Sequence, residues 1–565
     1  MVTSWLSAIA LAPLPFLAGY YSHHDGLILA NVRLLREAIS HGGQWPFNQY
    51  GSFGILPQTW FSYLFPTQYQ LLGIRIFTLL CYWSAGYLVF KLSRLFLSKN
   101  VALLTSSLFF ISQPFNGSNF LPWASSFLMP ILLGHTYLIA KLFSDKAANL
   151  KGQLVRIFLA GCLLPIVLLS RAQIGIIIFF VSSIFILLIL RVKGLTTYFI
   201  GISIPVILFF IFMSTQGWLY ESLFDEFIFG SIYVRYEDVA DIPVPIFSGL
   251  GTVIMFLLLI CKKKLWEYLT QKLSRRTIIG VLFIIFSLST FFVVDVMYSR
   301  RLGINAAYFV VLGRFWISLY LSCLLYFFYR LAQDNYLAMK NSQDRSGNLL
   351  RDNFLIFTAL AAQFQIWPFF DSMHFWWGSV PAVVIVATVL SKEFSIAHLN
   401  SVVRKRIKIS LAILITGLAI IPWVTQVQVS RSALVLYGTH GIYINTSDAV
   451  LNKNTREFLE KNISDRATVL NLCQNPDVYL TIKSISSATR YFVFWSPMKH
   501  IDSIQRSFEI SKPDVIVTCT LNEFNTDTQI QVEQQQQKIL EKVAPERKLI
   551  ATAKLGKVWQ VWDIR

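Results

Sequence analysis

The sequence is poor in charged residues, and acidic ones are the scarcest. Charged residues make up 14% of the 565 positions, against 55% hydrophobic and 15% aromatic. Soluble domains have a lower apolar content, so the composition excludes a soluble protein and indicates a polytopic membrane protein. The 49 Lys and Arg outnumber the 30 Asp and Glu, for a net charge of +19. These basic residues are scattered between apolar runs, which favours a topological role over nucleic-acid binding.

Cysteine is also scarce, with six residues and no CxxC spacing. This excludes a metal or disulfide framework, although Cys473 and Cys519 each end a predicted strand and are candidates for one disulfide. The first apolar segment lacks a basic flank and a clear cleavage site, so we do not interpret it as a signal peptide. There is no Gly-rich phosphate loop in the last 135 or so residues, and no repeat of solenoid length anywhere.

Long apolar runs dominate what is present. A spanning helix needs about 20 mostly apolar residues, and the sequence contains about thirteen candidates. They lie near 3–20, 70–90, 101–113, 123–140, 155–170, 172–190, 197–215, 245–261, 277–295, 307–329, 354–368, 374–391 and 409–427.

The loops between these segments alternate in charge. Basic clusters such as 262–264 and 404–406 occur on every second loop. The other loops carry few basic residues: Arg33, Arg36, Arg171, Arg235, Arg300 and Arg301. The positive-inside rule places the first set in the cytoplasm. The N-terminus is then expected in the cytoplasm, and the poorly charged loops and the C-terminal region outside it.

The sequence divides into two predicted domains, a transmembrane domain at 1–429 with a long outer loop 1 at 22–69, and a small extracytoplasmic α/β domain at 430–565. In the second domain we expect strands over 468–472, 514–519, 549–553 and 558–562, with helices over 447–459, capped by Ser447, and 529–543.

The motif His23-His24-Asp25-Gly26 stands at the end of the first apolar segment. A charge there is costly unless it faces protein or a wet cavity. Asp25 is therefore either a solvated helix terminus or a general base that takes the proton of an acceptor hydroxyl. Consecutive histidines on a helix point about 100° apart. One of them would join Asp25 or a metal, or both are ordinary interfacial residues.

The rest of loop 1 continues this pattern. The run 27–39 is amphipathic and suits a helix lying along the membrane interface. The aromatic and glycine-rich stretch at 42–51 suits a tight return that places Tyr50 near the mouth of the helix bundle.

Two further groups are expected on the same side. Asp371 and His374 lie in the short joint between two apolar segments, where they either form a polar hairpin tip or bind substrate beside His24 and Tyr50. Arg171, Arg300 and Arg301 either anchor lipid headgroups or bind a phosphate by charge-assisted hydrogen bonds. A phosphate leaving group needs a nearby cation more than an acid.

Two stretches carry a resemblance to a known family. Tyr21-x-His23-His24-Asp25-Gly26, followed by Gly43-Gln44-x-Pro46-Phe47-x-Gln49-Tyr50-Gly51, resembles the first outer loop of bacterial GT-C-fold glycosyltransferases. These polytopic enzymes use polyprenyl-phosphate sugars and are related to protein mannosyltransferases and lipid A sugar transferases. Pro368-Phe369-Phe370-Asp371-Ser372-Met373-His374 is similar to a Pro-x-x-Asp-x-x-His element of a late outer loop.

The resemblance implies that Asp25 is the catalytic base of an inverting glycosyl transfer. Relatives often carry an Arg-Asp pair before Tyr-Gly, where this sequence has Asn48 and Gln49. The second carboxylate of those relatives, and a metal site built on it, is therefore not expected. No metal ligand is assigned, and a divalent cation is left open as the one cofactor.

The sequence thus predicts a multi-pass protein of a bacterial inner membrane that moves a sugar from a polyprenyl-phosphate donor to a glycan, lipid or protein acceptor on the outer face. Two alternatives stay open: a transporter or flippase of envelope precursors, and a scaffold for envelope assembly. Transporters carry ionisable groups in mid-membrane and paired halves with broken helices. Here Arg75 and Arg314 are the only residues among Asp, Glu, Lys and Arg that lie inside predicted spans rather than at their ends.

Overall fold

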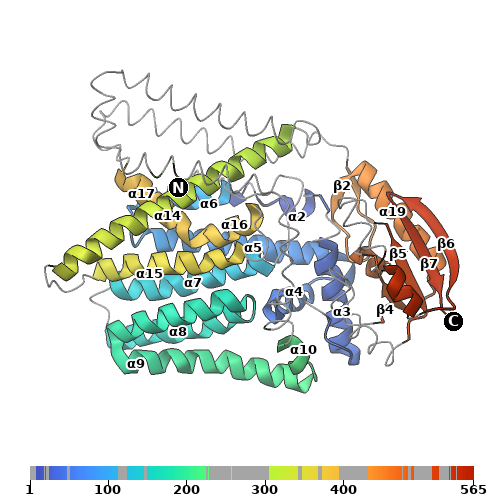
Figure 1. Ribbon diagram of the computed structural model, residues 1–565, viewed down its shortest axis with the longest axis horizontal. Helices are drawn as coiled ribbons and strands as arrows, with labels where there is room; N and C mark the ends of the chain where they lie inside the picture. Colours follow the sequence, from blue (N-terminus) through green and yellow to red (C-terminus); the bar gives the residue numbers. More distant parts are fainter. Residues whose placement is uncertain are drawn as a thin grey trace.

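The structure is a computed structural model. It describes residues 8–9, 11–17, 19–20, 25–46, 51–111, 124–144, 149–223, 227, 253, 256, 304–340, 347–366, 372–393, 431–473, 475–481, 485–488, 512–520, 534, 536–542 and 544–564. Most of these residues are helical, and the strands are confined to the C-terminal part. The protein is therefore a mostly helical chain with a separate C-terminal sheet (Figure 1).

The helices pack side by side into a bundle (Figure 1). Those of the bundle are α5 (Gln70–Ser93), α6 (Lys99–Ile111), α7 (Ala124–Ser144), α8 (Leu150–Leu168), α9 (Ala172–Thr215), α14 (Ile304–Lys340), α15 (Gly347–Ala362), α16 (Ser372–Ser379) and α17 (Val383–Glu393). Short helices lie at one end: α2 (Leu14–Leu17), α3 (Leu27–His41), α4 (Leu56–Ser62), α10 (Leu219–Leu223) and the 3₁₀ turns η2 (Ser52–Gly54) and η3 (Thr67–Tyr69).

Among the described residues, four helices are long and apolar enough to cross a membrane: Thr67–Ser93, Ala124–Ser144, Leu150–Leu168 and Ala172–Thr215. Each corresponds to at least one predicted span. The last one covers two, since Arg191 has a non-helical φ of 52° and breaks α9 between the predicted spans 172–190 and 197–215. The polytopic architecture expected from the sequence is confirmed in this part of the chain.

Two predicted spans differ from the structure. The span at 374–391 is split into α16 and α17 by the 3₁₀ turn η7 (Val380–Ala382), because Pro381 has no N–H for a helical hydrogen bond. In the span at 3–20 the described residues are helical at 8–9 and in the four-residue α2, with a turn at 11–13 between them, in a segment that contains Pro13 and Pro15. The predicted spans 245–261, 277–295 and 409–427 lie almost wholly or wholly outside the described residues.

Contacts at the two ends of the bundle agree with the predicted sides. At one end the Phe53 amide donates to the carbonyl oxygen of Leu169 (3.1 Å), and the Trp218 indole donates to that of Gly43 (2.7 Å). Gly43, Phe53 and Trp218 lie in loops predicted to be outside, and Leu169 lies at the end of a predicted span on that side. At the other end Arg351 donates to the carbonyl oxygen of Leu95 (2.6 Å), joining two loops predicted to be cytoplasmic.

The C-terminal region forms a five-stranded mixed sheet in the order β4-β3-β5-β7-β6. Its strands are β3 (Thr468–Asn471), β4 (Ser486–Ser487), β5 (Val515–Cys519), β6 (Lys548–Leu555) and β7 (Lys557–Asp563). β3 is parallel to β4 and β5, whereas β7 is antiparallel to β5 and β6. A second, two-stranded sheet pairs β1 (Arg431–Ala433) with β2 (Tyr443–Asn445), and α19 (Thr446–Asn462) follows it.

These elements match the predicted strands closely. β5 is buried along its whole length, as expected for the apolar central strand of a sheet covered on both faces. The helix predicted at 447–459 is α19, but its N-cap is Asn445, whose side chain accepts from the Ser447 amide. Ser447 is therefore not the cap, because the helix begins before it. Of the helix predicted at 529–543, residues 534 and 536–542 are described, and they are helical.

The candidate disulfide forms. Cys473 follows β3 and Cys519 ends β5, and the two are bonded with their Cα atoms 5.0 Å apart. The parallel register of β3 and β5 brings the carboxyl ends of both strands to the same edge. The bond therefore fixes the start of the next segment, the 3₁₀ turn η9 (Pro476–Leu480).

Candidate functional site

Asp25 lies in the turn that leads into α3, and it forms a two-point ion pair with Arg75 of α5. Arg75 Nε donates to Asp25 Oδ1 at 3.1 Å, and Nη2 lies 3.0 Å from Oδ2. Both side chains are completely buried, with 0% of their surface exposed. The prediction that Asp25 is a solvated terminus is therefore wrong, because protein encloses the carboxylate.

Arg75 is held by more than the carboxylate. It lies in the second turn of α5, and its guanidinium also donates to the carbonyl oxygens of Pro15 (3.3 Å) and Gly19 (2.6 Å). A buried ion pair stabilises a fold only where further hydrogen bonds satisfy its polar atoms. Here the carbonyl oxygens of Pro15 and Gly19 supply these bonds, so the backbone course of this opening segment depends on Arg75.

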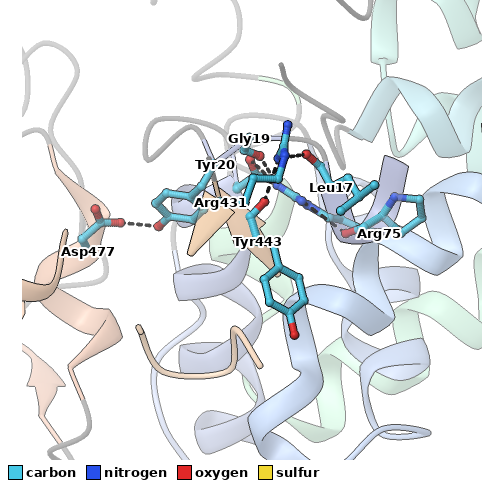
Figure 2. Close-up of polar contacts among 9 residues, drawn as sticks. Leu17, Gly19, Tyr20, Arg75, Arg431, Tyr443 and Asp477 are labelled. Carbon is cyan, nitrogen blue, oxygen red and sulfur yellow. Dashed lines mark hydrogen bonds and ion pairs between the residues drawn. The ribbon is translucent and has the colours of Figure 1, made fainter. Parts of the chain in front are cut away.

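The C-terminal region binds the same opening segment (Figure 2). Tyr20 donates a hydrogen bond to Asp477 Oδ1 in η9. Arg431 of β1 donates to the carbonyl oxygen of Leu17 and to that of Tyr443 (3.1 Å). The described residues between Pro15 and Tyr20 are thus fixed from one side by α5 and from the other by the C-terminal region.

α3 also contacts the C-terminal region, through Arg33. Its Nη1 donates to the carbonyl oxygens of Tyr479 (2.7 Å) and Thr481 (2.8 Å), and its guanidinium lies 4.0 Å from the centre of the Tyr437 ring. The arginine side chain is 3% exposed. Most residues of α3 are buried, and Arg33 faces protein.

The residue after Asp25 is a glycine for a packing reason. A Cβ atom on Gly26 would lie 2.6 Å from the Tyr20 hydroxyl, 2.7 Å from Asp477 Oδ1 and 3.1 Å from Pro476 Cγ. Distances under 3.0 Å are not tolerated without movement of the neighbours. Gly26 therefore lets η9 approach the backbone beside Asp25.

The chemistry of the site follows from the pair. The guanidinium of Arg75 places its donor groups and positive charge against both oxygens of the Asp25 carboxylate. Arg75 binds both carboxylate oxygens of Asp25 and so fixes the orientation of the carboxylate. The arrangement orients a carboxylate that is able to accept a proton from a hydroxyl group placed against it.

The described residues do not form a metal site around Asp25. They contain no group of three or more His, Cys, Asp and Glu side chains with metal-binding geometry. Hard cations such as Mg²⁺ need several oxygen ligands, whereas the neighbour of Asp25 is a guanidinium.

Of the other predicted site residues, Arg171 is described. It lies half-buried at the N-cap of α9, in the turn whose Leu169 carbonyl binds Phe53 of loop 1. The remaining predictions fall outside the described residues or, for His374, on a helical backbone position in α16 whose side chain is not described. Those outside are His24, Tyr50, Asp371, Arg300 and Arg301.

Sequence reasoning missed three residues of the site: Arg75, Tyr20 and Asp477. Arg75 did carry a signal, since an arginine within an apolar span must find a partner at its own depth. Asp25 stands at the same predicted side and satisfies that requirement. Tyr20 and Asp477 carried no local signal, because they are 457 residues apart and no sequence motif links them.

No protein-family model matches the sequence, and no curated protein matches it. Three solved structures show a similar arrangement. The Archaeoglobus fulgidus oligosaccharyltransferase tethered with an acceptor peptide has a TM-score of 0.47 and 13% identity, over 92% of this chain and 68% of that chain. AglB from the same organism, with an inhibitory peptide and a dolichol-phosphate, has a TM-score of 0.47 and 13% identity over 91% and 69%. ArnT from Cupriavidus metallidurans bound to undecaprenyl phosphate has a TM-score of 0.40 and 11% identity over 99% and 96%.

Proposed function

We propose that the protein is a membrane glycosyltransferase that moves a sugar from a polyprenyl-phosphate donor to an acceptor hydroxyl, with Asp25 as the general base. The observation that carries the proposal is the buried Asp25–Arg75 pair at the junction of loop 1, α5 and the C-terminal region. A buried ion pair is seldom the most stable choice for a fold. It is well suited to holding one carboxylate in one orientation.

The reaction follows from this geometry. Asp25 accepts the proton of the acceptor hydroxyl as that oxygen bonds to the anomeric carbon of the sugar. The bond between this carbon and the lipid phosphate oxygen breaks, and the phosphate leaves with the electron pair. A single displacement of this kind inverts the anomeric configuration. Arg75 orients Asp25 before the step and remains beside it while the proton arrives.

The departing phosphate needs positive charge. Arg171 precedes the first turn of α9, and a helix N-terminus favours an anion through its unpaired N–H groups and dipole. We assign the phosphate to Arg171, together with Arg300 and Arg301, and the sugar or the acceptor to His24, Tyr50, Asp371 and His374. In this assignment the cations replace a general acid, because phosphate is already a good leaving group.

The site is proposed to face the outside of a bacterial inner membrane. Disulfides persist in oxidising compartments, and the Cys473–Cys519 bond lies in the region that contacts loop 1. With the charge alternation of the loops, this supports a cytoplasmic N-terminus and about thirteen spans. The domain at 1–429 would then hold the membrane site, and the domain at 430–565 would cover it from outside.

The donor class is proposed from the resemblance of loop 1 and the 368–374 segment to GT-C-fold glycosyltransferases. It is also the class of lipid with which AglB and ArnT were solved, a dolichol-phosphate and undecaprenyl phosphate respectively. The acceptor is a hydroxyl of a glycan, a lipid or a protein.

The test is transfer by the purified protein. Radiolabelled undecaprenyl-phosphate sugars are incubated with a panel of oligosaccharides, glycolipids and serine- and threonine-containing peptides, and label in the acceptor is measured. Asp25→Asn is expected to lower kcat about a thousandfold, since a general base usually contributes roughly 10²–10⁴-fold. Transfer by Asp25→Asn at the wild-type rate would overturn the assignment of Asp25. No transfer with any donor, alongside solute flux in liposomes, would replace the proposal with a transporter.

A further inference from the structure

η9 brings a second acidic residue to the site. Asp477 is at the start of η9, is only 5% exposed, and accepts the hydrogen bond of the Tyr20 phenol. Both groups contact the position of Gly26, the residue next to Asp25. Tyr20 is also within electrostatic range of Asp25 and Arg75. Four polar side chains from three distant parts of the chain therefore gather around one turn.

The attachment of η9 to loop 1 does not require this carboxylate. Arg33 holds the segment by the carbonyl oxygens of Tyr479 and Thr481. The Cys473–Cys519 bond anchors the stretch before it, and the Asn475 side chain accepts from the Asp477 amide at 2.8 Å. Because these contacts already set the position of η9, burying a carboxyl group at its start adds a desolvation cost. A role in the site accounts for that cost.

The side of the site on which η9 lies indicates which substrate it would contact. A polyprenyl donor keeps its chain among the apolar helices, so its sugar approaches from the bundle. η9 belongs to the C-terminal sheet region, which lies beyond loop 1 at the end of the bundle (Figure 1). We expect an acceptor that comes from the water to approach Asp25 from the side of this region.

We propose that Tyr20 and Asp477 form the acceptor-binding side of the Asp25 site. Tyr20 is the residue that contacts the acceptor, and Asp477 is a positioning residue that holds the phenol by its hydrogen bond. The C-terminal region thus contributes to substrate binding in addition to covering the membrane domain. The inference rests on the proposed glycosyl transfer.

The experiment measures KM for the acceptor, KM for the donor and kcat in the full-length protein. It uses an undecaprenyl-phosphate sugar and the acceptor that is most active in the panel above. Tyr20→Phe and Asp477→Asn are each expected to raise the acceptor KM about tenfold, the range for a hydrogen bond to a charged group. The donor KM and kcat should stay within about twofold. The double variant should be no worse than either single one, because both changes remove the same interaction.

Two controls separate binding from folding. Asp448→Asn changes an exposed carboxylate of α19, and all three constants should stay as in the wild type. Limited proteolysis reports whether the C-terminal region remains attached. Asp477→Asn should be cleaved at the wild-type rate, whereas Arg33→Met, which removes the two bonds to η9, should be cleaved faster.

Each other outcome contradicts the inference. The inference is overturned if the acceptor KM is unchanged, or if only the donor KM or kcat changes. It is also overturned if the effects of Tyr20→Phe and Asp477→Asn multiply to about a hundredfold in the double variant. In each of these cases the proposed transfer still stands. An acceptor effect in Asp477→Asn accompanied by proteolysis as fast as in Arg33→Met would show a purely structural role. A wild-type protein that transfers no sugar would overturn the proposed function and this inference together.

Discussion

Arg75 of α5 binds Asp25 through both carboxylate oxygens although the two residues are 50 positions apart. The same guanidinium donates to two backbone carbonyls of the opening segment. One side chain of a membrane helix therefore determines the position of the candidate base and the course of the chain before it. The consequences of this pair, and of the contacts around it, are testable separately.

Removal of one partner should cost more than removal of both. Arg75→Met leaves a buried carboxylate uncompensated, which destabilises a protein by about 3–5 kcal/mol. The double change Asp25→Asn/Arg75→Met removes both charges and should recover a large part of that loss. The midpoint of thermal unfolding is measured in detergent, with size-exclusion chromatography as the readout. If the double variant unfolds at a temperature no higher than that of Arg75→Met, the unpaired carboxylate is not the source of the lost stability.

Gly26→Ala should impair transfer without unfolding the bundle. The added methyl group meets the Tyr20 hydroxyl and Asp477 Oδ1 at distances under 3.0 Å, so η9 must move away from Asp25. We expect activity to fall at least about tenfold, since small displacements at a reacting centre cost rate steeply. Gly134→Ala is the matched control, because its methyl would meet only the ends of two leucine side chains, Leu163 at 3.3 Å and Leu88 at 3.9 Å. Equal activities in the two variants would argue against a close approach at Gly26.

The attachment of the C-terminal region should depend on Arg33 and not on its helical neighbour Arg36. Arg33 donates to two carbonyls of that region, whereas Arg36 binds Ser62 and the Tyr63 ring within loop 1. Arg33→Met should therefore speed limited proteolysis between the two regions several-fold, and Arg36→Met should not. The fragments are identified by mass spectrometry. Similar cleavage of both variants would mean that loop 1 as a whole, rather than Arg33, holds the region.

Reduction of the Cys473–Cys519 bond should destabilise the C-terminal sheet by about 2–4 kcal/mol, the usual range for a disulfide. The bond joins the ends of β3 and β5, so its loss should release the start of η9 and lower transfer. Cys473→Ser/Cys519→Ser is compared with Cys81→Ser, which alters a free cysteine of α5. Alkylation followed by mass spectrometry shows whether the pair is oxidised in the purified protein. If both cysteines are alkylated without a reductant, the bond is absent.

The membrane sides are tested with alkaline-phosphatase fusions. A fusion after residue 430 should be active, because charge alternation places the C-terminal domain outside. A fusion after Ser93, at the end of α5, should be inactive. The opposite result for both would reverse the orientation and place the Asp25 site in the cytoplasm.

Much of the fold was predictable because its signals are local. Apolar runs of membrane length mark α5, α7, α8 and both halves of α9, and short β-branched runs mark β3, β5, β6 and β7. The pairing of Cys473 with Cys519 followed from strands that end in cysteine. The helix break at Pro381 was also readable in the sequence but was not predicted, since the apolar run continues through it.

The sequence by itself determined that the chain crosses a membrane several times, that its C-terminal part combines strands with helices, and that Asp25 is a candidate functional acid. These properties depend on hydropathy and residue type over short stretches. Only the tertiary structure decided that Asp25 is paired with Arg75, that Arg33 faces the C-terminal region instead of lipid, and that Asp477 reaches the site. Those contacts join residues from 50 to 457 positions apart. They depend on how whole elements pack, and no local pattern encodes that packing.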